Sequence, residues 1–256
     1  MQLNDRAGDG RARRVTAERL DHLAPDDPLA ICSRRDLQRI HRVMRSLSIL
    51  QDALSRLSLA NPPLRILELG AGDGTLLLRL ARTRASRWSG VELTLLDRHD
   101  LLSSVGREAY RQLGWNVTVD CADVLQWARS PLVRRYDLCI TTLFLHHFDS
   151  ADLGMVLAGV AARTDAFIAC EPRRSPFARM GSRLLGLLGA NEVTREDGAK
   201  SVAAGFSGSE LTQLWSQANR DWWTREYPAW PFTHCFVAAR PHVRALVPAP
   251  ADPDEP

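Results

Sequence analysis

The stretch RILELGAGDGTLLLRLA, residues 65–81, joins an apolar strand pattern to a leucine-rich helix pattern through three glycines. Gly70, Gly72 and Gly74 are spaced two residues apart, and Glu68 precedes them. Glycine permits a tight turn and carries no Cβ that would keep a ligand away from the backbone. This combination predicts a nucleotide-like ligand at the end of the strand.

The position of the third glycine separates this loop from the dinucleotide fingerprint. That fingerprint has its third glycine three residues after the second, where this chain has Thr75. The third glycine is Gly74 instead, so the loop can lie beside a ligand that has no pyrophosphate. We therefore expect neither a nicotinamide nor a flavin cofactor.

Strand and helix patterns alternate along the middle of the chain. Strands are expected at 66–69, 91–96, 117–119, 136–142 and 166–170, and helices at 75–81, 101–113 and 151–162. Such alternation predicts an α/β fold, with a doubly wound, mostly parallel sheet between two layers of helices. Residues 221–240 look like two further strands joined by a turn, which makes seven strands with an antiparallel pair at the end.

The two ends of the chain lie outside this alternation. Residues 1–60 are expected to be a disordered polar tail, up to about Asp27, and then a helical lid with apolar residues at helical spacing from Ser33 to Leu59. The sheet domain is expected over 61–242, with a lid insertion at 172–206 and a flexible tail at 243–256. Both lids can close over an apolar ligand, although ordinary packing onto the sheet's outer helices is the alternative.

Composition argues for a small partner. The 256 residues are 45% hydrophobic and 25% charged, and a net charge of +3 gives no field that favours a polyanion. The five cysteines, at 32, 121, 139, 170 and 235, show no metal-ligand spacing and are expected to be reduced thiols. No signal-peptide pattern or membrane-length apolar run is present in the sequence. We expect a cytoplasmic protein with no metal, nucleic-acid partner or membrane span, and leave open whether it forms a homodimer.

Four elements in order resemble the class I S-adenosylmethionine-dependent methyltransferases. They are LELGAGDG, an acid at the end of the second strand, ADV after the third strand, and YDLCITTLFLHHF around the fourth. The resemblance covers about residues 65–240 and implies a Rossmann-like domain that binds S-adenosylmethionine. It implies that the methionine part of this cofactor contacts Glu68, Gly70, Ala71 and Gly72 of the first motif, and Gly74 is predicted as a further cofactor-binding residue of the same loop.

Two acids are candidates to hold the cofactor's ribose. Glu92 lies closer to the spacing of about 20 residues from the glycine loop that is typical of such units. Strand register favours Asp97, because VELTLL is a good strand and Asp97 then lies at its carboxyl edge, where such ligands bind. We predict Asp97, with Arg98 beside the adenine.

The resemblance also implies cofactor contacts after the third and fourth strands. Asp123 matches the family's contact to the adenine amine, with Val124 packing nearby, and Thr141 and Leu143 lie at the edge of the fourth strand. Asp123 can also be the N-cap of the following helix, and the two roles do not exclude each other.

The chemistry requires few protein groups. Methyl transfer from a sulfonium needs in-line alignment, a dry site and, for some acceptors, a base. His146 and His147 are candidates to take a phenolic or enolic proton, since histidine titrates near neutrality. Glu171 is expected to point into the same cleft and orient an acceptor hydroxyl. The alternatives are that the histidines only pack or cap the next helix, and that Glu171 only anchors Arg173 or Arg174.

Further phrases resemble one branch of this class, the small-molecule methyltransferases encoded beside bacterial type III polyketide synthases and related to the quinone-biosynthesis methyltransferases. These phrases are ERLDHLAPDDP, SRRDLQRIHRVM, FLHHF, CEPRRS and FTHCFVA. The resemblance implies an enzyme of secondary metabolism whose acceptor is small, aromatic or lipophilic, and phenolic, quinone-like or polyketide, with oxygen favoured over carbon. An RNA or protein methyltransferase and a non-catalytic cofactor-binding partner protein are the alternatives.

Overall fold

The computed structural model describes residues 12–59, 65–217 and 219–243. Its centre is a seven-stranded sheet in the order β3-β2-β1-β4-β5-β7-β6. The strands are β1 Arg65–Leu69, β2 Glu92–Asp97, β3 Asn116–Cys121, β4 Tyr136–Thr142, β5 Thr164–Pro172, β6 Trp223–Ala229 and β7 Thr233–Ala239. Strands β1 to β5 are parallel, and β7 runs antiparallel to its neighbours β5 and β6. The predicted mostly parallel sheet with an antiparallel last strand is confirmed.

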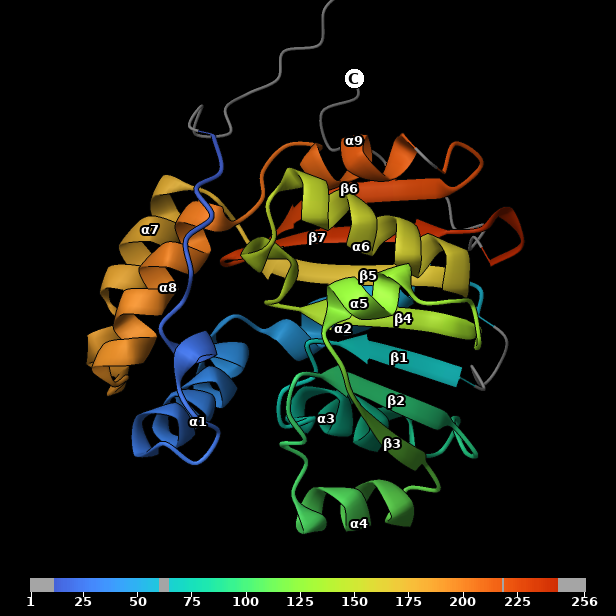
Figure 1. Ribbon diagram of the computed structural model, residues 1–256, viewed down its shortest axis with the longest axis horizontal. Helices are drawn as coiled ribbons and strands as arrows, with labels where there is room; N and C mark the ends of the chain where they lie inside the picture. Colours follow the sequence, from blue (N-terminus) through green and yellow to red (C-terminus); the bar gives the residue numbers. More distant parts are fainter. Residues whose placement is uncertain (1–11, 60–64, 218, 244–256) are drawn as a thin grey trace, which may run out of the picture.

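Helices cover both faces of this sheet (Figure 1). The helices on one face are α2 Ser46–Leu54, α3 Thr75–Arg84 and α4 Ser104–Gln112, and those on the other are α5 Val124–Arg129, α6 Ser150–Arg163 and α9 Glu210–Ser216. Two buried apolar clusters result, one on each face. Ile66 belongs to the first cluster and Leu67 and Leu69 to the second, because successive side chains of a strand point to opposite faces.

A third group of helices lies beyond the carboxyl ends of the parallel strands (Figure 1). It consists of α1 Pro28–Val43, α7 Pro176–Arg183, the short 3-10 helix η3 Leu185–Leu188, and α8 Glu192–Ala204. The lid insertion predicted at 172–206 thus contains α7 and η3, which meet at Leu184, followed by α8. This group borders the sheet edge at which ligands bind in α/β folds.

The N-terminal helical stretch is two helices with different environments. Asp27 caps α1, since its side chain accepts the N–H of Leu29 at 2.7 Å, and Arg45 in a left-handed conformation (φ 55°) separates α1 from α2. The expectation that all of this stretch forms a lid is wrong for α2. Its apolar side chains are buried in the core cluster of the sheet, namely Ile49, Leu50, Ala53 and Leu54.

The polar segment at residues 12–23, here called the N-terminal strap, is ordered along α8 and is not a disordered tail (Figure 1). The backbone N–H groups of Arg19 and Leu20 donate to the carboxylate of Asp197 on α8 at 2.8 and 2.9 Å. The Arg13 guanidinium donates to the carbonyls of Ala204 and Phe148 at 2.9 and 3.0 Å. The polar groups of the strap thus find partners on α8 and in the loop after β4, which explains why composition alone misassigns this segment. The rest of the predicted tails, 1–11 and 244–256, lies outside the described residues.

Candidate active site

A cavity of about 860 Å³ lies where the carboxyl ends of β1, β2 and β4 meet α1, α8 and the strap. This volume is within the usual range for sites that bind small molecules. The predicted site residues that line it are Glu68, Gly70, Ala71, Gly72, Asp97, Arg98, Asp123, Val124, Leu143, His146 and His147. Gly74, Thr141 and Glu171 lie behind its wall instead.

The glycine loop has the backbone that the sequence predicts. All three glycines adopt positive φ angles of 64°, 54° and 69°, which disfavour residues with a Cβ. A Cβ on Gly70 would lie 2.3 Å from the Phe144 ring, whereas a Cβ on Gly72 would meet no atom of the described residues within 4 Å apart from its chain neighbours. Gly74 instead packs against Leu95 and accepts the Tyr110 hydroxyl at 2.7 Å. The loop is therefore closed on its protein side and open towards the cavity at Gly72.

Glu68 has a buried carboxyl group whose environment indicates a ligand. Its side chain is buried, and Oε2 has no hydrogen-bond partner among the described residues. Burial, with the nearby charges of Asp73 and Asp97, raises the pKa of Glu68 well above its ordinary value. A buried carboxyl beside two other acids suits a cationic or N–H-donating ligand. The residues present therefore fit the ammonium and sulfonium groups of S-adenosylmethionine.

Asp97 lies where the strand-register argument places it. It ends β2 and accepts the N–H groups of Gly72 and His99 at 2.9 and 3.2 Å. Glu92 begins the same strand, at the opposite edge of the sheet, and pairs with Arg65 at 3.3 Å. Asp97 is thus part of the cavity and Glu92 is not, while the ribose contact itself stays a prediction. Arg98, beside Asp97, pairs with Asp21 of the strap at 3.1 Å.

The residues after β3 and β4 that are expected to contact the cofactor differ in whether they line the cavity. Asp123 caps α5 by accepting the N–H groups of Leu125 and Gln126 at 2.9 and 3.2 Å, and it also lines the cavity. The Thr141 hydroxyl instead donates to the carbonyl of Leu69 at 3.0 Å, which joins β4 to β1 inside the sheet. Leu143 follows β4 with a positive φ of 53°, and it lines the cavity.

Glu171 does not point into the cleft, contrary to expectation. Its fully buried carboxylate accepts the backbone N–H groups of Phe144, Leu145 and His146, at 3.1, 3.0 and 3.4 Å. It also lies 2.9 Å from Nδ1 of His146. Since β5 neighbours β4, the carboxylate at the end of β5 is well placed to satisfy the loop that follows β4. The alternative of an anchor for Arg174 is also wrong, because Arg174 pairs with Glu210 at 2.6 Å.

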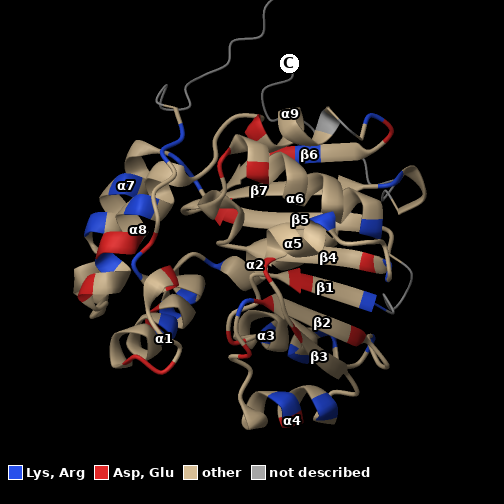
Figure 2. Ribbon diagram, in the orientation of Figure 1, with Lys and Arg blue, Asp and Glu red and all other residues tan. Residues whose placement is uncertain are grey.

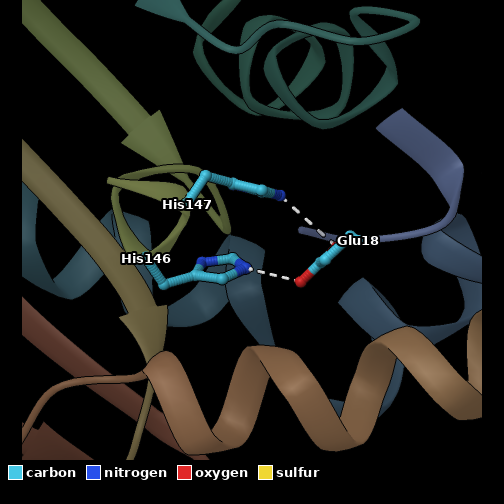
Figure 3. Close-up of side chains that lie close together, drawn as sticks. All are labelled: Glu18, His146 and His147. Carbon is cyan, nitrogen blue, oxygen red and sulfur yellow. Dashed lines mark hydrogen bonds and ion pairs between the residues drawn. The ribbon is translucent and has the colours of Figure 1, made fainter. Parts of the chain in front are cut away.

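The two histidines face a carboxylate from the strap, Glu18 (Figure 3). Nε2 of His146 lies 3.3 Å from Oε1 of Glu18, and Nε2 of His147 lies 3.4 Å from Oε2. Burial alone would lower the pKa of His147, but the hydrogen bond and charge of Glu18 and the charge of Asp21 raise this pKa to about 9. Burial alone would raise the pKa of Glu18, but both histidines hold this pKa well below its ordinary value. His147 therefore does not have the near-neutral pKa expected of a free imidazole.

Glu18 is the cavity residue that sequence reasoning missed. It lies in a polar stretch without periodicity, 128 residues before His146, so neither pattern nor spacing points to it. The one available signal is the phrase ERLDHLAPDDP, which begins at Glu18 and belongs to the quoted resemblance.

Comparisons with known proteins agree with this geometry. Residues 66–165 match the family described as "Methyltransferase domain". Two plantazolicin methyltransferases, BamL and BpumL, each in complex with a desmethylplantazolicin analogue and S-adenosylhomocysteine, have the same fold. BamL is 16% identical with a TM-score of 0.57, over 82% of this chain and 90% of its own. BpumL is 12% identical with a TM-score of 0.59, over 84% and 92%.

A third structure, the S-adenosylmethionine-dependent methyltransferase SibL in its apo form, is 16% identical with a TM-score of 0.56. It matches over 91% of this chain, which spans 63% of SibL's own length. The comparison with curated proteins finds no match. Among the helices of the described residues, none is long and apolar enough to cross a membrane. The matched methyltransferase model covers residues 66–165, and together with the strand order and the open glycine loop with its buried acid it supports an S-adenosylmethionine-dependent methyltransferase with a Rossmann-like fold.

Proposed function

We propose that the protein methylates a small, aromatic or lipophilic acceptor of phenolic, quinone-like or polyketide type, at oxygen in preference to carbon. The observation that carries the proposal is the continuity of the cavity. It extends from the glycine loop to an apolar wall built by α1, the lid insertion with α8, and the turn between β6 and β7, which includes Leu37, Ile40, Met44, Leu185, Val202 and Phe232. An apolar wall with a few polar groups is typical of sites for hydrophobic small molecules.

The cofactor end of the cavity would be divided among the predicted residues. When bound, S-adenosylmethionine supplies an electrophilic methyl group. We assign the methionine part to Glu68 and the loop at Gly70–Gly72, the ribose to Asp97, and the adenine to the neighbourhood of Arg98 and Asp123. Gly74 and Thr141 support this wall from behind, since neither lines the cavity.

The acceptor end contains the polar pair of His147 and Glu18. The His147 side chain is 21% exposed and lines the cavity, so it would lie beside a bound acceptor. His146 and Glu171 are positioning residues in this proposal, because their contacts hold the loop that carries His147. The strap excludes water from the same end, which favours transfer to the acceptor over loss to solvent.

Two alternative functions predict different acceptors. Figure 2 shows basic and acidic residues mixed along α8, a helix that lines the cavity, and the net charge is only +3, which does not favour a polyanion such as RNA. A non-catalytic partner protein would bind the cofactor without turnover.

We retain the cytoplasm as the proposed location, since all five cysteines are free thiols. The homodimer stays a proposal, to be tested by light scattering.

The test has two stages with separate readouts. Calorimetry should show that S-adenosylhomocysteine binds and that NAD and FAD do not, and the reverse result would refute the cofactor assignment. Transfer of radiolabelled methyl groups should then be measured with alkylresorcinols, quinols, total RNA and a protein extract. Label in the phenolic products supports the proposal, label confined to RNA or protein supports the alternative acceptors, and binding without any transfer supports the partner protein.

A further inference from the structure

Three side chains from two distant parts of the chain meet at the acceptor end of the cavity (Figure 3). His146 and His147 belong to the short 3-10 helix Leu145–His147 after β4, and Glu18 comes from the strap. Nε2 of the two histidines lies 3.3 and 3.4 Å from the two oxygens of Glu18, and one ligand atom of each residue lies within 4.8 Å of the others. Ligand atoms bound tetrahedrally to one zinc ion at about 2.0–2.2 Å are about 3.3–3.5 Å apart. Each histidine nitrogen lies at such a distance from a different oxygen of Glu18, so the carboxylate faces both imidazoles, and one ligand atom from each of the three residues lies near enough to the others to share an ion.

Both imidazole rings are oriented from behind by fixed acceptors. Nδ1 of His146 lies 2.9 Å from the Glu171 carboxylate, and Nδ1 of His147 lies 2.8 Å from the carbonyl of Phe144. A metal-bound histidine typically donates its other ring N–H to a carboxylate or a backbone carbonyl, which turns the lone pair of the ligating nitrogen towards the ion. Glu171 is itself held by backbone N–H groups, so this orientation does not depend on Glu18.

We propose that Glu18, His146 and His147 bind one divalent transition-metal ion, of the Zn²⁺ or Co²⁺ kind. Two imidazoles and one carboxylate are ligands for such ions, whereas Mg²⁺ and Ca²⁺ prefer sets of oxygen atoms. Three protein ligands leave a coordination position for water or for an anionic oxygen from the cavity. Asp21 is close enough to hold that water, since its Oδ2 lies 3.6 Å from Nε2 of His147.

The proposal is independent of the acceptor and can be tested without an activity assay. The full chain is treated with a chelator, dialysed and titrated with Co²⁺ and Zn²⁺, by calorimetry and by the visible d–d absorption of Co²⁺. We expect one equivalent of Co²⁺ to bind, with a histidine-ligated spectrum, and Zn²⁺ to displace it.

Variants separate this site from adventitious binding. Glu18→Gln keeps the size and hydrogen bonding of the side chain but removes its charge, and His147→Asn removes one imidazole at a partly exposed position. Each should weaken Co²⁺ binding at least tenfold, by analogy with the loss caused by orienting residues alone. His99→Ala is the matched control, an exposed histidine of the same cavity outside the cluster, and it should bind Co²⁺ as the parent does.

Circular dichroism and thermal melting of each chelator-treated variant establish that it is folded before titration. The proposal is overturned if the parent chain binds no Co²⁺ at tenfold molar excess, because the three residues are then only an ion-paired network that fastens the strap. It is also overturned if folded Glu18→Gln and His147→Asn bind Co²⁺ as tightly as His99→Ala.

Discussion

Replacement of Glu171 by glutamine should destabilise the protein by about 4 kcal/mol. The buried carboxylate accepts three backbone N–H groups of the loop after β4 and faces Nδ1 of His146. A glutamine carbonyl can accept about two of these four donors, and its NH₂ group must oppose the others. Hydrogen bonds to charged groups contribute about 1.5–3 kcal/mol each, so the loss of two gives about 3–6 kcal/mol.

Urea denaturation of Glu171→Gln, followed by tryptophan fluorescence, measures this loss as a lower free energy of unfolding. The chain offers a matched control in Glu226, whose side chain is 3% exposed and accepts the N–H groups of Leu211 and Thr212 at 3.1 and 2.7 Å. Its oxygen also lies 2.8 Å from Nε2 of His234, and it is remote from the cavity lining.

Both variants should be destabilised, and only Glu171→Gln should also lose affinity for S-adenosylhomocysteine. The reason is that the released loop includes Phe144, whose ring packs on Gly70. A change below about 1 kcal/mol in Glu171→Gln, or an equal loss of affinity in both variants, would refute this reasoning.

Three further predictions concern the cofactor end of the cavity and α1. Asp97→Ala should weaken S-adenosylhomocysteine binding by about 1.5–3 kcal/mol, because charge-assisted hydrogen bonds are lost, whereas Glu92→Ala at the other end of β2 should leave calorimetric affinity unchanged. Gly72→Ala should lower that affinity by more than the about 1–2 kcal/mol that the strained left-handed backbone costs, since the new Cβ would enter the cavity. Gly154→Ala on α6 is the control, because a Cβ there would meet no atom of the described residues within 4 Å beyond its own helix. It should bind normally and gain about 0.5–1 kcal/mol of stability. Burial lowers the pKa of His41 to about 4, and the charge of Asp73 opposes this shift while that of Arg79 adds to it. In the unfolded chain the same histidine has a pKa near 6.5, so it takes up a proton there at a higher pH than in the folded protein. The free energy of unfolding should therefore fall by up to about 3 kcal/mol from pH 6.5 to 4, and this part of the decrease should be absent from urea titrations of His41→Gln.

The sequence by itself determined the parts of this protein that rest on local periodicity and backbone chemistry. The run from Ile66 to Ala81 specifies a buried strand, a loop with positive φ angles and a helix, because apolar alternation, glycine and helical spacing act within a few residues. The same local logic places Asp97 at the carboxyl end of its strand. The antiparallel pair at the end of the sheet follows from chain connectivity alone.

Only the tertiary structure decided which distant groups meet. Helical spacing alone does not distinguish α1, beside the cavity, from α2, in the core, because both have an apolar face. Likewise, the sequence shows a carboxyl group at Glu171 but not the three N–H groups that it satisfies on the neighbouring strand's loop.

Glu18 is the clearest example of this limit. It carries no periodic signal, and its place between His146 and His147 depends on the strap's hydrogen bonds to α8. Polar side chains and backbone groups can pair with many partners, and the folded geometry selects one of them. Short-range sequence patterns therefore determined the sheet and the glycine loop, whereas the acceptor end of the cavity was decided by contacts between segments more than a hundred residues apart.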